Sequence, residues 1–289
     1  LTEHEFNLSD FALFLSVVKN PRAYQCMLSV FMEEPDIELA EVKVEQVILN
    51  KVGKRAIRLD AWAKSTDNRQ FNMEMQNDTK GDDVRKRSRF YQGLIDTPIL
   101  KAGKKTKYKQ LPSTIIIFIT QEDIFKKDLA MYTFTEQCEE IQGLQLGDGT
   151  KKIFLNMSSK NGSKELVSLL QYMKNTTLDN PDIQVKDERI IELDKIVTEV
   201  RESEEWEEAR MTILELGMNK GIEIGEQRGM QQGLVKLVCK KLIKGYSIKE
   251  IANHLEEDED TIRNIVEIAQ KYAPEYDTAK ILKELWENK

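Results

Sequence analysis

The sequence contains few of the residues on which several common functional sites depend. It has 3 cysteines and 2 histidines among 289 residues, and they are scattered along the chain. An odd number of widely spaced cysteines does not suit a disulfide scaffold, so a reducing compartment is favoured. Isolated histidines give little support to a zinc site or to a histidine-based catalytic triad. We therefore expect a cytoplasmic protein whose chemistry depends on other side chains.

Long apolar segments and phosphate-binding loops are also missing. No stretch approaches the roughly 18 uncharged apolar residues of a membrane-spanning helix, and the longest apolar run, residues 115–119, has the length of a buried strand. Residues 1–5 lack the basic and then apolar pattern of a signal peptide. No glycine-rich loop follows a predicted strand, which argues against an ATP-dependent enzyme. We expect a soluble protein that does not associate with a membrane.

Charge is unevenly distributed along the chain, although the net charge is only -7. Residues 51–109 hold sixteen Lys or Arg against seven Asp or Glu, whereas residues 176–289 hold 17 basic and 26 acidic residues. This overall charge argues against a generally basic nucleic-acid binder, but the basic segment is where phosphates would bind. The alternative is that these lysines and arginines form an ordinary solvated face.

The spacing of apolar residues predicts an α/β domain in residues 1–175. Helical spacing near the N-terminus is followed by strand patterns, a helix, further strands and a closing helix. This order is typical of a mixed sheet flanked by helices. Residues 176–289 are acidic and helical in pattern, so we expect an all-α C-terminal extension. The expected strands are residues 44–49, 56–65, 70–77, 114–120, 132–134 and 153–156, and the expected helices after the first strands are residues 83–100 and 163–174.

Two of the predicted strands place carboxylates opposite each other. In residues 56–65, apolar side chains at positions 57, 59, 61 and 63 alternate with polar ones that include Asp60. The strand at residues 70–77 alternates in the same way, with Glu74 among its polar residues. If the hairpin loop between the strands holds an odd number of residues, the ladder sets Asp60 directly across from Glu74.

Opposed carboxylates repel each other unless something offsets the repulsion. A Mg²⁺ ion binds carboxylates and waters in an octahedral oxygen shell, and it can activate a water and neutralise charge on a phosphodiester. Asp60 and Glu74 are therefore candidate ligands of Mg²⁺, with Mn²⁺ as an alternative ion. The competing interpretation is a solvent-facing polar side of the hairpin, with Arg58 as the counter-ion.

Several short motifs follow one another in order through the first domain. They are Arg58-Leu59-Asp60, Asn72-Met73-Glu74-Met75-Gln76, Lys86-Arg87-Ser88-Arg89-Phe90-Tyr91, Leu111-Pro112, Ile116-Ile117-Phe118-Ile119-Thr120 and Gly147-Asp148-Gly149. Over about residues 8–175, this series resembles the recombination-promoting nuclease and putative transposase (Rpn) family of the PD-(D/E)XK superfamily. The resemblance implies a restriction-endonuclease-like core and Mg²⁺-dependent cleavage of DNA.

The resemblance also implies roles for single residues. Asp60 corresponds to the motif aspartate and Glu74 to the second acid, so both would hold the metal ion. Gln76 occupies the position of the superfamily's catalytic lysine, but a glutamine brings no charge and only hydrogen-bonds to the attacking water. Arg58 is a candidate for the missing positive charge, as a phosphate clamp. Asp10 stands where the family pattern has a further acid, and it is either a third metal ligand or a helix N-cap.

The basic helix that follows Glu74 is expected to bind DNA. Arg87 and Tyr91 are four residues apart, so they share a helical face from which both can reach one phosphate. Neighbouring basic residues and the lysine-rich loop at residues 104–109 would extend this contact. For Arg87, the alternative is a salt bridge to an acid such as Asp83.

The C-terminal extension contains two further patterns. Glycines recur every four residues from Gly217 to Gly233, which aligns them along one helical ridge and lets another helix approach closely. A flexible spacer is the alternative. Residues 247–269 resemble a helix-turn-helix with a capping box at Ser247, but the five acids at residues 256–260 would repel phosphate. We therefore expect these helices to form a homo-oligomer rather than to bind DNA.

The sequence thus predicts a Mg²⁺-dependent DNA endonuclease that is linked to recombination or mobile elements. The rival interpretation is a nucleic-acid-binding protein that keeps the nuclease fold without turnover. Gln76 is the feature that favours the rival, because it replaces a charged catalytic residue.

Overall fold

The computed structural model describes residues 6–49, 54–79, 81–100 and 107–287. It confirms the predicted α/β architecture, because a mixed sheet with flanking helices is followed by a helical C-terminal region. Residues 104–106, half of the basic loop expected at residues 104–109, lie outside the described residues. Among the helices of the described ranges, none is long and apolar enough to cross a membrane.

The first part of the chain alternates between helices and strands, and the last part is helical. The strands are β1 (Leu39–Ile48), β2 (Ile57–Ser65), β3 (Gln70–Gln76), β4 (Thr114–Thr120), β5 (Met131–Phe134) and β6 (Thr150–Asn156). The helices are α1 (Phe11–Val18), α2 (Pro21–Phe31), α3 (Val84–Asp96), α4 (Lys164–Lys174), α5 (Glu188–Arg201), α6 (Glu204–Ile243), α7 (Ile248–Leu255), α8 (Glu259–Gln270) and α9 (Thr278–Glu287), with a short 3-10 turn at Tyr108–Gln110.

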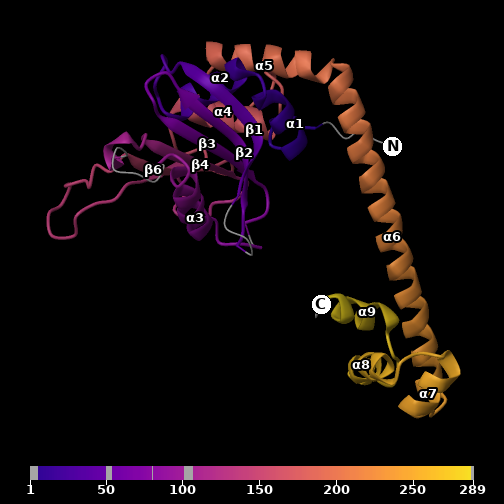
Figure 1. Ribbon diagram of the computed structural model, residues 1–289. Coiled ribbons are helices and arrows are strands. Elements are labelled where there is room, and N and C mark those ends of the chain that lie inside the picture. Colours follow the sequence, from indigo (N-terminus) through magenta and orange to yellow (C-terminus); the bar gives the residue numbers. More distant parts are fainter. Residues whose placement is uncertain (1–5, 50–53, 80, 101–106, 288–289) are drawn as a thin grey trace. The chain divides into compact units, whose positions relative to one another are not determined.

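The six strands form one sheet in the order β1-β2-β3-β4-β6-β5 (Figure 1). The hairpins β1–β2 and β2–β3 are antiparallel, β3, β4 and β6 run parallel, and β5 returns antiparallel at the edge. Parallel neighbours require a crossover, and α3 forms part of the connection between β3 and β4. This connection places a basic helix directly after the strand that carries Glu74.

Apolar side chains cover both faces of the sheet, which explains the continuous apolar run in β4. Ile115, Ile117 and Ile119 belong to the core shared with α1, α2, α4 and α5. Ile116 and Phe118 point the other way and pack with Tyr91 and Ile95 of α3. A strand that is covered on both sides has no polar face.

Strand β2 departs from the predicted alternation at Asp60. The apolar residues before and after Asp60 pack on different faces: Ile57 and Leu59 on the α3 side, Ala61 and Ala63 on the opposite side. On the neighbouring strand, Glu45 has a positive φ of 50° and is left out of the ladder between β1 and β2. The alternation predicted that the apolar side chains at positions 57, 59, 61 and 63 all lie on one face of the sheet. This prediction is wrong, because an irregularity at Asp60 turns the side chains before and after it to opposite faces.

The chain forms two compact units, Leu1–Ala209 and Arg210–Lys289, so the division lies later than the predicted boundary after residue 175. Helix α5 belongs to the first unit because its buried residues Ile190, Leu193, Ile196 and Val197 join the core around α1, α2 and α4. At the start of α6, Trp206 packs edge-on against Phe6 with ring centroids 5.4 Å apart. Helix α5 lies in the acidic part of the chain, but its buried apolar face places it in the first unit.

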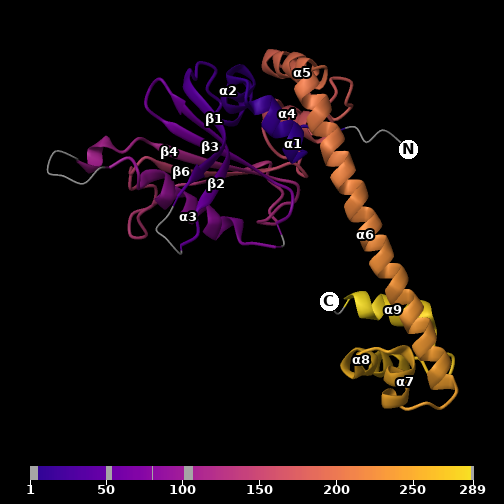
Figure 2. The ribbon, with the colours of Figure 1, turned by 45° about the vertical axis from the view of Figure 1, so that its right-hand side comes forward.

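The second unit has its own small core between the end of α6 and helices α7, α8 and α9 (Figure 2). The predicted capping box is confirmed, since the Ser247 and Glu250 side chains each bond the other's backbone amide. Helix α8 begins after Asp258, which caps it, and carries Glu259 and Asp260 in its first turn. The first turn of the second helix in this helix-turn-helix-like pair is therefore acidic.

Candidate active site

Asp60 and Glu74 lie where strands β2 and β3 separate. The β2–β3 ladder has the predicted register from Lys64↔Gln70 to Ala61↔Met73, and it ends one residue before the two acids. From there, side chains replace the backbone ladder: the Asp60 amide donates to Glu74 Oε1 at 3.0 Å, and the Met75 amide donates to Asp60 Oδ2 at 3.0 Å. These reciprocal bonds hold the two carboxylates close together between the strands.

Glu74 is almost completely buried and has two further donors. Its side chain is 1% exposed, and Asp60 is 7% exposed. Asn72 Nδ2 donates to Glu74 Oε1 at 2.9 Å, and Arg87 Nη2 donates to Glu74 Oε2 at 3.1 Å. Such contacts are needed because an unpaired buried carboxylate is costly in free energy. We assigned no role to Asn72 from the sequence, although its position two residues before Glu74 on the same strand was the available signal.

Arg87 is in direct contact with Glu74. From α3, its guanidinium donates to Glu74, to Gln76 Oε1 at 2.6 Å, and to the Tyr91 hydroxyl at 2.7 and 2.9 Å. Its side chain is 24% exposed. Arg87 and Tyr91 share a helical face as predicted, but this face is turned toward the carboxylates, and the ion-pair partner of Arg87 is Glu74 rather than Asp83.

Gln76 has both ends of its amide engaged. Its Oε1 accepts from Arg87, and its Nε2 donates to the carbonyl of Asp78. Arg58, the expected source of positive charge near this position, is 57% exposed and pairs with Glu45 at 3.5 Å. The charge that touches Gln76 therefore comes from α3 and not from β2.

Asp10 lies at the start of α1, near the end of β3. Asn77, just beyond β3, donates to the carbonyl of Ser9 at 3.0 Å. Asp10 occupies the N-cap position but makes no capping bond, and its carboxylate accepts from the Asn7 amide at 2.7 Å. Within the described ranges, no group of three or more Asp, Glu, His or Cys side chains is arranged to hold a metal ion. Asp10 is thus at the same end of the sheet as the acid pair but does not form a three-ligand cluster with it.

Burial changes the acidity of the pair. Desolvation raises the pKa of Asp60 to about 6, and desolvation together with the nearby Asp60 carboxylate raises the pKa of Glu74 to about 8. The two groups titrate as a coupled pair, because charge on one disfavours charge on the other. Burial also raises the pKa of Tyr91 to about 12, so its hydroxyl stays protonated at neutral pH.

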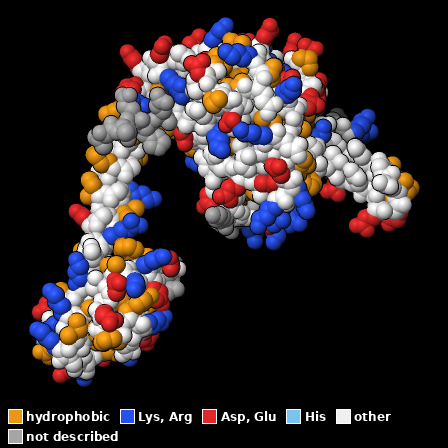
Figure 3. All heavy atoms as spheres, turned by 180° about the vertical axis from the view of Figure 1, so that it is seen from behind, with side chains coloured by type: hydrophobic (Ala, Val, Ile, Leu, Met, Phe, Trp, Pro, Cys, Tyr) orange, Lys and Arg blue, Asp and Glu red, His pale blue; other side chains and the backbone are white. Residues whose placement is uncertain are grey.

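A cavity of about 530 Å³ opens beside the acid pair. Asp60, Arg87 and Tyr91 line it, and exposed basic residues that include Arg58 and Lys86 surround it. In Figure 3, Lys and Arg side chains gather on the side of the first unit that carries α3. Asp60 therefore faces a space that is bordered by positive charge, and Glu74 lies behind it.

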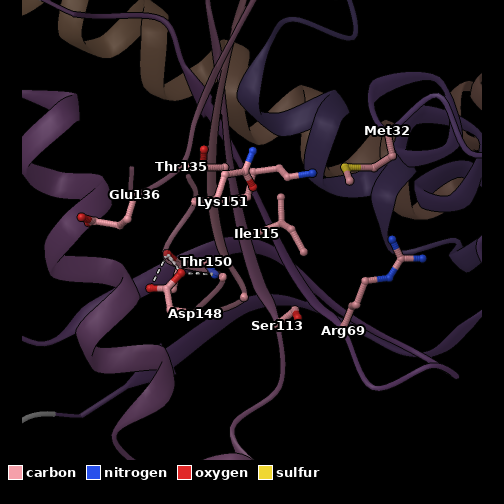
Figure 4. A pocket seen from close by; sticks show the side chains of 12 residues that line it. Met32, Arg69, Ser113, Ile115, Thr135, Glu136, Asp148, Thr150 and Lys151 are labelled. Carbon is pink, nitrogen blue, oxygen red and sulfur yellow. Dashed lines mark hydrogen bonds between the residues drawn. The ribbon is translucent and has the colours of Figure 1, made fainter. Parts of the chain in front are cut away.

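A second cavity, of about 280 Å³, lies at the other end of the sheet (Figure 4). Its lining includes the Gly147-Asp148-Gly149 motif, and the Asp148 carboxylate bonds the amide and hydroxyl of Thr150. Gly149 has a φ of +80°, and a Cβ there would lie 2.9 Å from Ser113 Oγ. This motif forms a tight turn before β6 and contributes no residue to the acid pair.

Comparison with protein families decides which group of proteins this site belongs to. Residues 10–215 match the model of the PD-(D/E)XK nuclease family transposases. The chain belongs to this family. Searches of curated proteins and of solved structures give no significant match. The match covers the sheet, the acid pair and helix α3, and it continues into α6.

PD-(D/E)XK nucleases typically use divalent metal ions, and the residues of this site suit one. Asp60 and Glu74 supply hard carboxylate oxygens, and Mg²⁺ is commonly bound by one or two carboxylates with waters completing its shell. Arg87 contacts Glu74, while Asp60 feels the charges of Arg87 and Arg58 without a direct ion pair to Arg87. Desolvation and then the nearby Asp60 carboxylate raise the pKa of Glu74, and a divalent cation would offset the second of these effects.

The raised pKa values predict how the metal-free protein responds to pH. Their ordinary values are 3.8 for Asp60 and 4.5 for Glu74, so the folded state holds more protons than the unfolded state up to about pH 8. Stability should therefore fall as pH rises from about 5 to about 8. We expect thermal melting in EDTA to show this decline, and Glu74→Gln to flatten it. A melting temperature that rises over this range in the wild-type protein would contradict the prediction.

Arg87 should be needed for the stability of the metal-free fold. Arg87→Met leaves the buried Glu74 without its counter-charge, and we expect a loss on the order of 2 kcal/mol in the free energy of unfolding at pH 8. The double variant Arg87→Met with Glu74→Gln should recover most of this loss, because the charge that needs a partner is gone. Urea denaturation of the four proteins measures the coupling. Equal losses in the single and double Arg87 variants would show that Arg87 acts independently of Glu74.

Proposed function

We propose that this protein is a Mg²⁺-dependent DNA endonuclease that hydrolyses phosphodiester bonds during recombination or the movement of mobile elements. The observation that carries the proposal is the buried pair Asp60 and Glu74, held by reciprocal bonds, with Asp60 in the wall of a cavity that basic residues line. Membership of a family of nucleases and transposases supports DNA as the substrate. A buried acid pair is a destabilising arrangement, which a purely structural hairpin does not need.

The side chains have distinct roles in this proposal. Asp60 and Glu74 would hold Mg²⁺, which when bound activates a water and neutralises charge on the phosphate. Asp10, at the same end of the sheet, is the candidate for a further acidic contact. Gln76 accepts from Arg87, so the pair places a polar amide and a fixed positive charge where the superfamily has a lysine. Because a guanidinium stays protonated, Arg87 stabilises negative charge and does not act as a base.

Bound DNA would lie across the basic side of the first unit. Arg58 and Lys86 border the cavity, and Arg85 and Arg89 extend the exposed charge along α3. Such contacts fix the position of the phosphate backbone and carry no sequence information. The buried Tyr91 holds Arg87 in place, because its hydroxyl accepts two hydrogen bonds from the guanidinium.

A second candidate function is DNA binding without turnover. The observation that favours it is Gln76, whose amide is already engaged at both ends and whose side chain cannot supply the charge of a lysine. The two candidates differ in their response to Mg²⁺, because only the nuclease requires the ion for a chemical step.

Cleavage of supercoiled plasmid should require both Mg²⁺ and the acid pair. We expect Asp60→Asn to abolish nicking and to remove the rise in melting temperature that Mg²⁺ causes by binding the folded state. Gln76→Ala should lower the rate on the order of tenfold to a hundredfold through loss of positioning. Asp82→Asn is the matched control, since Asp82 is an exposed acid that lines the same cavity and should be dispensable. Nicking by Asp60→Asn at the wild-type rate would refute the assignment.

The proposed function includes self-association through α6. Five glycines from Gly217 to Gly233 lie in this helix, and nothing lies within 4 Å of the position of a Cβ at any of them. Exposed apolar residues Leu214, Met218 and Ile222 recur beside them at the same four-residue interval. Each glycine costs a helix about 1 kcal/mol relative to alanine. Close packing of a second copy along this ridge would offset that cost.

Dimerisation and helix stability should respond in opposite directions to changes on this ridge. Gly221→Leu with Gly225→Leu should stabilise the isolated helix by about 1 kcal/mol per site but weaken the dimer, because side chains then block close approach. Light scattering at micromolar concentration should give a dimer for the wild-type chain and a monomer for the variant. Lys220→Ala, one residue before Gly221, is the control. A wild-type monomer would contradict the proposal.

A further inference from the structure

The cavity beside the acids has an apolar wall that contact with phosphates does not require. Ala56, Ile57, Phe90 and Tyr91 line it together with the charged residues. Ile57 is 4% exposed, whereas the Phe90 ring is 40% exposed. Contacts with the phosphate backbone need cations and hydrogen-bond donors on an open surface. An aromatic ring set among apolar side chains suits a flat, weakly polar group instead.

Helix α3 presents two neighbouring ridges to this cavity. Arg87 and Tyr91 form the inner ridge, where Arg87 bonds Glu74. Lys86 and Phe90, also four residues apart, form the outer ridge and are both exposed. The helix therefore places an exposed aromatic ring beside a cation, on the same cavity as the proposed catalytic Asp60.

A nucleotide combines the two kinds of group that this cavity would bind. Its base stacks on aromatic rings whatever its identity, and its phosphate binds lysine and arginine. The cavity volume of about 530 Å³ lies within the range of about 300 to 1,000 Å³ that is usual for small-ligand sites. In a continuous duplex, however, bases are stacked and paired inside the helix. A base reaches such a cavity only when it is unpaired or extruded.

We propose that the cavity binds an unpaired nucleotide through stacking on Phe90, so that the preferred substrate is DNA with an unpaired base near the bond that is cut. This rests on the proposed nuclease function for the cleavage step, but the binding preference stands apart from turnover. Lys86 and Arg58 would hold the adjacent phosphates. Asp60 lines the same cavity, so the unpaired nucleotide would lie close to the acid pair.

Binding and cleavage are tested separately with two short duplexes that differ only by one unpaired adenine. In EDTA, fluorescence anisotropy with the full-length protein should give tighter binding of the bulged duplex by about fivefold or more, in line with the contribution of one base–aromatic stack. Phe90→Ala should remove this preference, and Phe90→Trp should keep it. Trp286→Ala, which removes an exposed aromatic ring from the second unit, is the control.

Equal binding of the two duplexes by the wild-type protein, or a preference that survives in Phe90→Ala, would overturn the inference. Melting temperatures of the variants establish that each is folded, and Phe90→Trp keeps the test decisive if Phe90→Ala unfolds. With Mg²⁺, cuts should map next to the unpaired base. Cleavage of neither duplex would refute the proposed nuclease while the anisotropy ratio still decides the binding preference.

Discussion

The arrangement of this site depends on two acids that are buried together. Asp60 and Glu74 each bond the backbone of the opposite strand, so the β2–β3 ladder ends where their side chains begin. Burial raises the pKa of both groups, and Arg87 supplies the positive charge in contact with Glu74. In the proposed function, a divalent cation would relieve the repulsion that makes the metal-free site costly.

The sheet and helix α3 make this arrangement possible. The parallel connection from β3 to β4 passes through α3, which carries Arg87 back over the strand that bears Glu74. Apolar packing on both faces fixes β3 and β4, so the carboxylates are held by a rigid core rather than by a loop. At Asp60, where the side chains of β2 turn to the opposite face of the sheet, regular pairing with the neighbouring strands is interrupted. The irregular position in the sheet is therefore the one proposed to carry the chemistry.

Positive charge in the first unit serves two purposes. Arg87 is half-buried and compensates Glu74 within the fold, whereas Arg58, Lys86 and Arg89 remain at the surface, where DNA would bind. Basic residues that are neighbours in sequence therefore differ in role: Arg87 stabilises the fold, whereas Lys86 and Arg89 are exposed to a ligand. In the helix-turn-helix-like pair of the second unit, the first turn of α8 carries acids. This supports a role for the C-terminal helices in self-association.

Local patterns in the sequence determined the order of helices and strands, the hairpin register and the candidate acids, because alternation and turn residues act over short distances. They also identified Arg87 and Tyr91 as one helical face. The tertiary structure alone decided what that face contacts: Arg87 meets Glu74 and Gln76 across 13 and 11 residues of sequence. It also assigned α5 to the first core, and it revealed the change of side at Asp60. These features depend on packing between distant segments, which no local spacing encodes.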